Sequence, residues 1–279
     1  MEFSLRDIPN DYSYKKDYLD KNSDKLEILL LGNSHIYFGV NPIYLKHRSF
    51  NASHISQSLD YDLEILKKYD TRWTNLKYIV VPIDYFSFYS KLETGIENWR
   101  VKNYNIYYGI KGNCNFWDNF EVPNSKFKDN LYRILNDKSD ITCNLLGWGT
   151  TYNSKKNKSL IETGSIATKR HTIKKDDLIF NQNIETVKSI INFANKNNIK
   201  LIFITSPAYK TYTDNLDRNQ LETTVRTIND LISAKQNSKY YNLINDKSFK
   251  FEDFYDADHL NEIGAKKLTT KIDSLVRLN

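Results

Sequence analysis

The chain has 279 residues, of which 40% are hydrophobic and 27% are charged, and this length and composition allow a full hydrophobic core and exclude an intrinsically disordered chain. The net charge of +6 comes from 40 basic and 34 acidic residues. Because no recognition motif or long basic stripe concentrates this excess, we predict no nucleic-acid partner.

The apolar pattern along the chain predicts strands that alternate with helices. Residues 1–24 are rich in polar side chains and predict an irregular lead-in. Residues 26–31 form a short apolar run that ends at Gly32, which is typical of a strand buried on both faces of a parallel sheet. The later expected elements are, in chain order, a strand at 49–51, a helix over 59–70, a strand over 77–83, a helix over 181–197, a strand over 200–205, a helix over 216–235, a strand over 240–243 and a helix over 261–276.

This alternation predicts the fold class. Strands that are connected through helices form a parallel sheet, and the helices cover both of its faces. We therefore predict an α/β protein in three layers, α/β/α, with a doubly wound and mostly parallel sheet. We expect residues 1–279 to form a single domain.

Residues 90–178 interrupt the alternation. This segment has no clear periodicity and contains three of the four tryptophans. A stretch of this length inside a regular domain is usually an insertion or a functional cap, so we predict an insertion of irregular structure over one edge of the sheet. The segment also holds Cys114 and Cys143, which could close a disulfide in an oxidising compartment or stay free thiols otherwise.

Two short polar motifs near opposite ends of the chain carry the candidate chemistry. GNSH at 32–35 follows the first predicted strand, so Ser34 lies at the sheet edge where ligands of open parallel sheets bind. DADH at 256–259 precedes the last predicted helix, and at this spacing the Asp256 carboxylate can orient the His259 imidazole in a turn. Together the motifs supply a nucleophile, a base and an orienting group. A structural alternative is that Ser34 is a turn residue and His259 caps a helix.

These motifs, in this order, resemble those of the GDSL/SGNH hydrolase superfamily. The GNSH form and the tail DADHLNEIGAKKLT, residues 256–269, are similar to the branch that acylates cell-envelope polysaccharides, which includes alginate acetyltransferases and the teichoic acid D-alanylation protein. The resemblance covers about residues 26–276 and leaves the middle insertion unmatched. It implies a flavodoxin-like sandwich, with Ser34 as the nucleophile, His259 as the general base and Asp256 as its orienting carboxylate.

The resemblance also implies an oxyanion hole with three donors. The first two are backbone N–H groups, that of Ser34 and that of Ser56, which stands at a glycine position of the family pattern. The third is an asparagine side chain, and in PIDY at 82–85 this sequence has Asp84 in its place. An ionised aspartate cannot donate a hydrogen bond to an oxyanion, so this donor is missing or another residue such as Ser87 supplies it.

Several further residues are candidates for the pocket or its surroundings. Those expected at the pocket, from their positions beside the motifs or at the carboxyl edge of the sheet, are Asn33, His35, Ser87, Pro207 and Tyr209. We expect His35 to pack or hydrogen-bond behind the nucleophile, with a role as a second base as the alternative, and Asp258 to be a loop or supporting residue. His47, His54 and His171 show no recognisable partners and are interpreted as structural or surface groups. No His or Cys pair has the spacing of metal ligands, so we predict no metal and no cofactor.

The resemblance implies a serine-dependent O-acyl transferase or esterase, with acetyl as the expected group, that acts on a cell-envelope polysaccharide through an acyl-serine intermediate. It implies a polysaccharide or oligosaccharide acceptor, an acyl donor and, as a further option, a membrane-bound acyl-transfer partner. It also implies an extracytoplasmic location, periplasmic or at the cell surface, as the soluble domain of a membrane-anchored protein. The chain given has neither a signal-peptide core nor an apolar run of the ~18 residues that a membrane span needs.

Two hypotheses of other classes stay open. A catalytically silent glycan-binding domain of the same fold would use the aromatic residues of the insertion as its platform, and the aspartate at position 84 supports it. A binder of nucleic acid or of anionic surfaces rests on the net charge alone, and steep salt dependence of binding would favour it.

Overall fold

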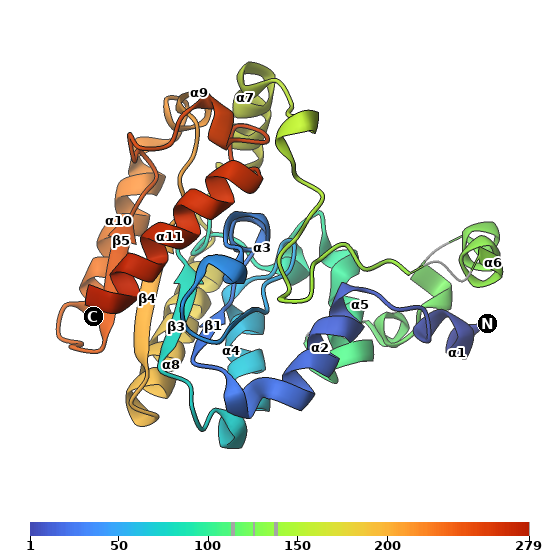
Figure 1. Cartoon of the computed structure of the whole chain (residues 1–279). Coiled ribbons are helices and arrows are strands. Elements are labelled where there is room, and N and C mark those ends of the chain that lie inside the picture. The colour runs from blue at the N-terminus through green and yellow to red at the C-terminus, as the bar shows by residue number, and fades with distance from the viewer. Residues whose placement is uncertain (113–114, 125, 137–138, 279) are drawn as a thin grey trace.

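The protein is built around a parallel β-sheet (Figure 1). The computed structural model describes residues 1–112, 115–124, 126–136 and 139–278. Within these residues the sheet has five strands in the order β2-β1-β3-β4-β5, and every neighbouring pair is parallel. The strands are β1 Ile28–Leu30, β2 Ser49–Asn51, β3 Tyr78–Pro82, β4 Lys200–Thr205 and β5 Ser238–Asn242.

Helices cover both faces of the sheet. The helices that follow the strands are α3 Ser34–Gly39, α4 Leu59–Lys68, α8 Asp177–Lys196, α9 Lys210–Thr213, α10 Arg218–Ile232 and α11 Glu262–Leu278. Successive strand residues point to opposite faces, and those on one face, such as Leu29 and Ile79, pack with α4 and α8. Those on the other face, such as Ile28 and Val80, pack with α3 and α11. The predicted α/β class, with three layers and a doubly wound sheet, is therefore confirmed.

The predicted strands and sheet helices are all present, with ends that differ by a few residues. The buried strands were predictable because a strand covered on both faces is apolar along its whole length. The order of the strands reverses between β1 and β3, since β2 lies on one side of β1 and the later strands lie on the other. In doubly wound sheets this reversal opens the crevice in which ligands bind.

The N-terminal segment corrects one prediction. Residues 1–24, expected to be irregular, form the helices α1 Glu2–Arg6 and α2 Asp11–Asn22. The Asn10 side chain caps α2 by accepting two backbone N–H groups of its first turn. The apolar pattern does not reveal α2 because its buried face includes Lys15, whose ammonium donates to a backbone carbonyl oxygen. Such a partner compensates for the burial of the charge.

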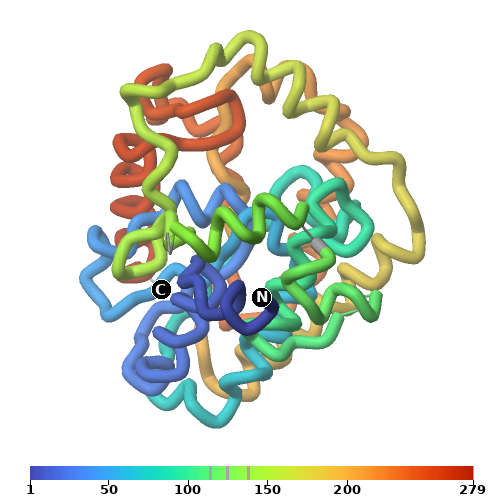
Figure 2. Tube along the Cα trace, turned by 90° about the vertical axis from the view of Figure 1, so that its right-hand side faces the viewer, coloured from blue at the N-terminus to red at the C-terminus, as the bar shows by residue number. Residues whose placement is uncertain are grey.

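Residues 90–178 contribute no strand to the sheet among the described residues. Besides short helical turns, they form the helices α5 Val101–Asn103, α6 Phe127–Asn136 and α7 Leu160–His171. Helix α6 lies beside the N-terminal helix α1 (Figures 1 and 2), and α7 packs against α9. The division into one domain with an insertion stays a prediction. Cys114 lies outside the described residues, so the two alternatives for its pairing with Cys143 stay open.

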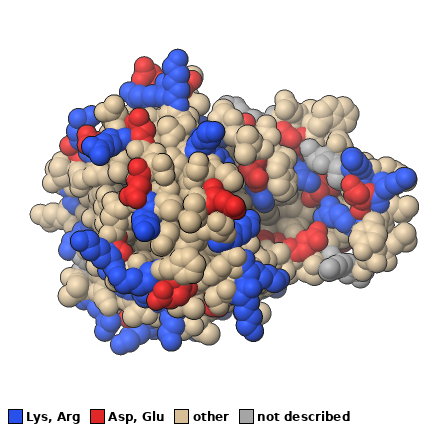
Figure 3. Space-filling view, turned by 90° about the horizontal axis from the view of Figure 1, so that it is seen from above, with Lys and Arg blue, Asp and Glu red and all other residues tan. Residues whose placement is uncertain are grey.

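The surface charges are mixed in sign. On the face shown in Figure 3, Lys and Arg side chains are interspersed with Asp and Glu. Some of these charges form ion pairs within one helix, as Lys67 does with Glu64 and Lys188 with Glu185. None of the helices in the described ranges combines the length and the apolar character that crossing a membrane requires.

Candidate active site

The residues of the two predicted motifs meet at the carboxyl ends of β1 and β3. Strand β1 leads into α3, which begins at Ser34, and Asp84 follows β3. The loop before α11 brings Asp256 and His259 to the same place, because His259 contacts Ser34 directly. This is the point at which the strand order reverses. The structure therefore places the candidate chemistry where doubly wound sheets bind their ligands.

The turn after β1 holds Ser34 at the first residue of α3. Gly32 has a φ of +113°, in the region that favours glycine, and its N–H donates to Asp62 Oδ1 at 2.7 Å. Asn33 caps α3, because its side-chain oxygen accepts the His35 N–H at 2.9 Å. The Ser34 N–H has no acceptor among the described residues. It is available to donate to the oxygen of a bound carbonyl group.

We expect the substitution Gly32→Ala to destabilise the fold. A Cβ at this position would lie 2.2 Å from Cδ and Cγ of Pro82 in β3, and the positive φ is strained for alanine. The free energy of unfolding should fall by about 3 kcal/mol or more, as measured by urea denaturation. Gly109→Ala is the matched control, because Gly109 has a φ of +65° but a Cβ there meets no atom within 4 Å. Equal losses in the two variants would contradict the close approach to Pro82.

Ser34, His259 and Asp256 form a hydrogen-bonded chain. The Ser34 Oγ lies 2.9 Å from His259 Nε2, and His259 Nδ1 lies 2.9 Å from Asp256 Oδ1. Asp256 Oδ1 also accepts the backbone N–H of His259 at 2.9 Å, which fixes the loop that carries both residues. When Nδ1–H is donated to the carboxylate, Nε2 is the nitrogen that can accept the Ser34 proton. This geometry suits a nucleophile, a base and an orienting carboxylate.

A second carboxylate faces the same imidazole. Asp258 is buried, and its Oδ1 lies 3.5 Å from His259 Nδ1. Burial alone would lower the pKa of His259, but the charges of Asp258 and Asp256 outweigh it and raise the pKa to about 10. Burial alone would raise the pKa of Asp258, but the charge of His259 and the close contacts of the carboxylate with His259 and His35 hold it well below its usual range. The imidazolium form of His259 is therefore strongly stabilised.

Ser56 and Asp84 are the other two residues at which an oxyanion donor was considered. Ser56 lines the same cavity as Ser34 and has a φ of +60°, the left-handed conformation that favours the glycine of the family pattern. Asp84 is buried, and its two oxygens accept hydrogen bonds from a backbone N–H and from Asn33 Nδ2, each at 3.0 Å. Burial would raise the pKa of Asp84, but the charge of His35 outweighs it and the pKa is lowered. The ionised Asp84 side chain is therefore not an oxyanion donor.

A cavity of about 730 Å³ opens beside Ser34 and His259. Much of its wall comes from residues 90–97 and 170–176 of the predicted insertion, together with Tyr152. The basic side chains on its wall are Lys91, Arg100, Arg170 and Lys174. The segment that the sequence predicts to cap the sheet edge thus forms part of the site.

The predicted pocket residues divide into two groups. Asn33 and Ser87 line the cavity, and Ser87 Oγ accepts the Asp84 N–H at 2.8 Å, which leaves its hydroxyl proton for a ligand. Pro207 and Tyr209 do not line it, which corrects the prediction made from their position after β4. Tyr209 instead occupies the N-cap position of α9, and its ring packs against two phenylalanine rings of the loop before α11.

Three histidines for which the sequence shows no recognisable partner, and which were interpreted as structural or surface groups, have partners in the structure. His54 stacks on Tyr12, with ring centroids 3.9 Å apart, and His47 Nδ1 lies 3.4 Å from Glu27 Oε1. His171 lines the cavity and its Nδ1 lies 2.9 Å from a tyrosine hydroxyl. Each partner lies far away along the sequence, so spacing alone could not reveal it.

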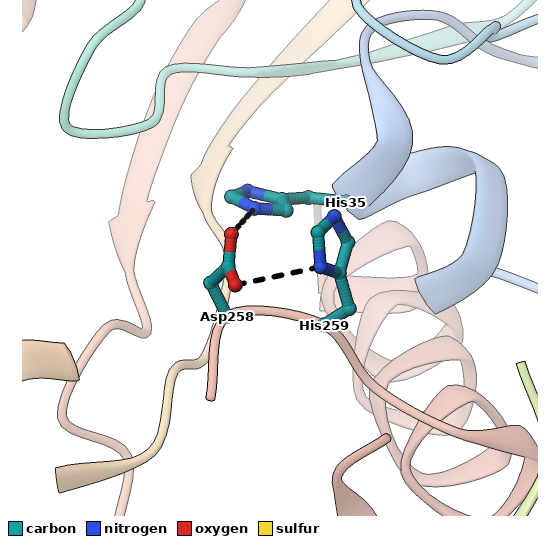
Figure 4. A group of neighbouring side chains, drawn as sticks. All are labelled: His35, Asp258 and His259. Atoms are coloured by element: carbon teal, nitrogen blue, oxygen red, sulfur yellow. Dashed lines mark ion pairs between the residues drawn. The ribbon is translucent and has the colours of Figure 1, made fainter. Parts of the chain in front are cut away.

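His35 lies beside Asp258 and His259 (Figure 4). Its Nδ1 is 2.9 Å from Asp84 Oδ2, and its Nε2 is 3.6 Å from Asp258 Oδ2. Neither ring nitrogen has an aligned hydrogen bond among the described residues, so both contacts are close approaches that become ion pairs when His35 is protonated. His35 does not line the cavity, and its role behind the nucleophile stays a prediction. The contacts with two carboxylates are what sequence reasoning missed.

His35, Asp258 and His259 could also approach one cation, because one candidate ligand atom from each lies within 4.8 Å of the others. The spacing argument against a metal site did not detect this group, since His35 comes from the other end of the chain. However, His259 Nδ1 already lies 2.9 Å from Asp256, and His35 Nδ1 lies 2.9 Å from Asp84. These contacts fit protonated imidazoles, so we assign no metal to the group.

Several solved structures are similar to this chain at low sequence identity. Among solved structures, the chain is similar to a candidate platelet activating factor protein from Streptococcus pneumoniae, with 11% identity over 95% of this chain and 91% of that one and a TM-score of 0.49. It is also similar to a candidate acylhydrolase from Bacteroides fragilis, with 10% identity over 96% and 94% and a TM-score of 0.47, and to a GDSL-like lipase from Bacteroides thetaiotaomicron, with 10% identity over 96% and 98% and a TM-score of 0.45.

No curated protein sequence matches the chain. A family model described as "Protein of unknown function (DUF1574)" matches residues 118–269, a range that includes Asp256 and His259 but not Ser34. Because this range covers more than half of the 279 residues, the chain belongs to the DUF1574 family.

Proposed function

We propose that this protein is a serine-dependent acyl-transfer enzyme, an O-acyltransferase or esterase that forms an acyl-enzyme on Ser34. The observation that carries the proposal is the contact of 2.9 Å between Ser34 Oγ and His259 Nε2, with His259 Nδ1 held by Asp256. The cavity beside these residues, about 730 Å³, is within the range of small-molecule sites. Its size suits a sugar unit and an acyl group together.

The proposed reaction proceeds in two halves. In the first, Ser34 Oγ attacks the acyl carbonyl carbon while its proton passes to His259 Nε2, and the oxyanion accepts the N–H groups of Ser34 and Ser56. The tetrahedral intermediate then collapses, and the leaving group takes the proton from His259. In the second half, an acceptor hydroxyl or water attacks the acyl-serine with the same base. The acceptor takes the acyl group, and Ser34 regains its proton.

The finer assignment concerns the acceptor and the location. We propose that the acyl group is acetyl and that the acceptor is a cell-envelope polysaccharide. A separate molecule would donate the acyl group, with a membrane-bound acyl-transfer partner as a further option. The protein would act on the outer side of the cytoplasmic membrane. This part rests on the resemblance of the GNSH and DADHLNEIGAKKLT motifs. A catalytically silent glycan-binding domain is the competing hypothesis. The aspartate at position 84 supports the glycan-binding hypothesis less than the sequence suggests, because its carboxylate lies 2.9 Å from His35 Nδ1 and so has a partner in the fold.

Intact-mass analysis after incubation with p-nitrophenyl acetate tests the proposal. We expect one acetyl group on the wild type, located on Ser34 by peptide mapping. No adduct, together with no release of p-nitrophenol above the rate without enzyme, would contradict an activated serine. Binding of oligosaccharides without any acyl adduct would favour the glycan-binding hypothesis.

The rate of acyl-enzyme formation should rise with pH through the neutral and alkaline range. Ser34 needs the neutral imidazole as its base, and the pKa of His259 is raised to about 10 by the neighbouring carboxylates, against the effect of burial. Because this pKa lies above its ordinary value, the neutral form is scarce below it and grows about tenfold per pH unit. Burst rates measured from about pH 6 to about pH 10, with a blank without enzyme, should show this slope. An acid limb centred near the ordinary histidine value of about 6.5 would contradict it.

A further inference from the structure

We propose that His35 and Asp258 form a buried ion pair that controls the charge beside the His259 imidazole, and that Asp84 is the counter-ion that holds His35. The inference rests on the proposed function, because it concerns the base of that reaction. It makes His35, Asp258 and Asp84 positioning residues, which act through His259 and do not touch the substrate.

The four side chains form one chain of contacts. Asp84 Oδ2 lies 2.9 Å from His35 Nδ1, His35 Nε2 lies 3.6 Å from Asp258 Oδ2, and Asp258 Oδ1 lies 3.5 Å from His259 Nδ1. The two oxygens of Asp258 therefore face two different histidines, as Figure 4 shows. His35 is 7% exposed, Asp84 2% and Asp258 3%. At such burial a carboxylate is tolerated only with a charged or hydrogen-bonding partner.

The surroundings favour a charged His35. Burial by itself would lower the pKa of His35, but Asp84 and Asp258 outweigh it and raise the pKa to about 8. The titratable and charged groups that face the ion pair are Asp84 after β3, Asp256 and His259 before α11, Arg170 and His171 at the end of α7, and Tyr212 in α9. Of these, the Arg170 Nη2 lies 3.3 Å from Asp258 Oδ2. It is half exposed, so solvent weakens its effect on the buried carboxylate.

This arrangement explains the aspartate at position 84. The family pattern has an asparagine there, and this chain has a carboxylate directly beside the His35 ring. With asparagine at position 84, the His35 imidazolium would keep only the more distant Asp258 as a partner. The histidine of the GNSH motif and the aspartate of PIDY are therefore one functional unit, although they look unrelated in the sequence.

The two members of the ion pair should shift the pKa of His259 in opposite directions. Asp258→Asn removes a negative charge from beside the imidazolium, so the pKa of His259 should fall. His35→Gln removes a positive charge from beside Asp258 and leaves the half-exposed Arg170 as its cationic partner on that side, so the Asp258 carboxylate acts more strongly on His259 and the pKa of His259 should rise. Each shift should be about one pKa unit, as expected for a charge at this distance. Asp84→Asn should lower the pKa of His35 itself.

The measurement is a pH titration of the imidazole nitrogens of the full chain by NMR. The chain has 5 histidines, so the signals of His259 and His35 are assigned from the variants that lack each of them. Asp273→Asn is the matched control, because Asp273 is a buried carboxylate on α11 whose partners are Lys46 and Arg277. It should leave the pKa of His259 unchanged. Circular dichroism establishes that each variant is folded.

Two results would overturn the proposal. The first is that the pKa of His259 shifts in the same direction in Asp258→Asn as in His35→Gln, or that it shifts in neither variant. The other needs no variant: a neutral His35 at pH 7 in the wild type would remove the ion pair. Because the titration does not depend on turnover, opposite shifts without a Ser34 adduct would contradict the proposed function only. A Ser34 adduct without the shifts would contradict the ion pair only.

Discussion

Replacing Ser34 with alanine should abolish the acyl-enzyme and lower the rate of p-nitrophenyl acetate hydrolysis by about 10³-fold or more. Ser34 Oγ is the oxygen that lies 2.9 Å from His259 Nε2, and alanine has no group that can form an ester. The backbone N–H at position 34 is retained, so the variant keeps the oxyanion donors and should still bind an acylated ligand. Stopped-flow burst amplitudes and intact mass measure the loss, and urea denaturation checks that the stability is unchanged.

Ser206→Ala is the control for this experiment. Ser206 follows β4 at the same edge of the sheet and is buried, but it does not line the cavity. Its contact with Asp84 is made by its backbone N–H, which alanine preserves. The control should keep the wild-type burst. A burst that survives in Ser34→Ala, or disappears equally in both variants, would contradict Ser34 as the nucleophile.

Asp256→Asn should lower the rate of acyl-enzyme formation by about 10²- to 10⁴-fold. The carboxylate lies 2.9 Å from His259 Nδ1 and stabilises the imidazolium that forms when Ser34 is deprotonated. An asparagine removes this charge, and if its amide N–H₂ faces Nδ1 it favours the wrong tautomer of the imidazole. The loss should be smaller than in Ser34→Ala, because Asp258 remains 3.5 Å from the same nitrogen.

The comparison with Asp258→Asn decides which carboxylate orients the base. Both residues belong to one loop, but Asp256 makes the closer contact with Nδ1 and also binds the backbone N–H of His259. At the alkaline plateau of the rate, where His259 is neutral, we expect the loss in Asp258→Asn to be at least tenfold smaller than in Asp256→Asn. A larger loss in Asp258→Asn would make Asp258 the orienting carboxylate and Asp256 a loop residue.

The parts of the fold that the sequence predicts are those with a local signal. Strands β1 and β3 are apolar throughout because helices cover both faces, and helix α4 shows its buried leucines at helical spacing. Helix α2 lacks such a signal, since its buried face includes the charged residue Lys15. The start of this helix is fixed by the Asn10 side chain, which accepts backbone N–H groups of the first turn. In 90–178, the described helices α6 and α7 pack against the distant helices α1 and α9, and such contacts cannot be read from the spacing of residues within the segment.

By itself, the sequence determined the order of the strands and of the helices that follow them in the sheet. From two motifs it also predicted the set Ser34, Asp256 and His259, because each motif lies within a few neighbouring residues of the chain. Only the tertiary structure decided what surrounds that set. Asp84 and His35 follow different strands, and their side chains meet at 2.9 Å. This contact gives the aspartate, which departs from the asparagine of the family pattern, a charged partner in the proposed ion pair. Charge effects depend on distance in space rather than along the chain, so no reading of spacing could have assigned them.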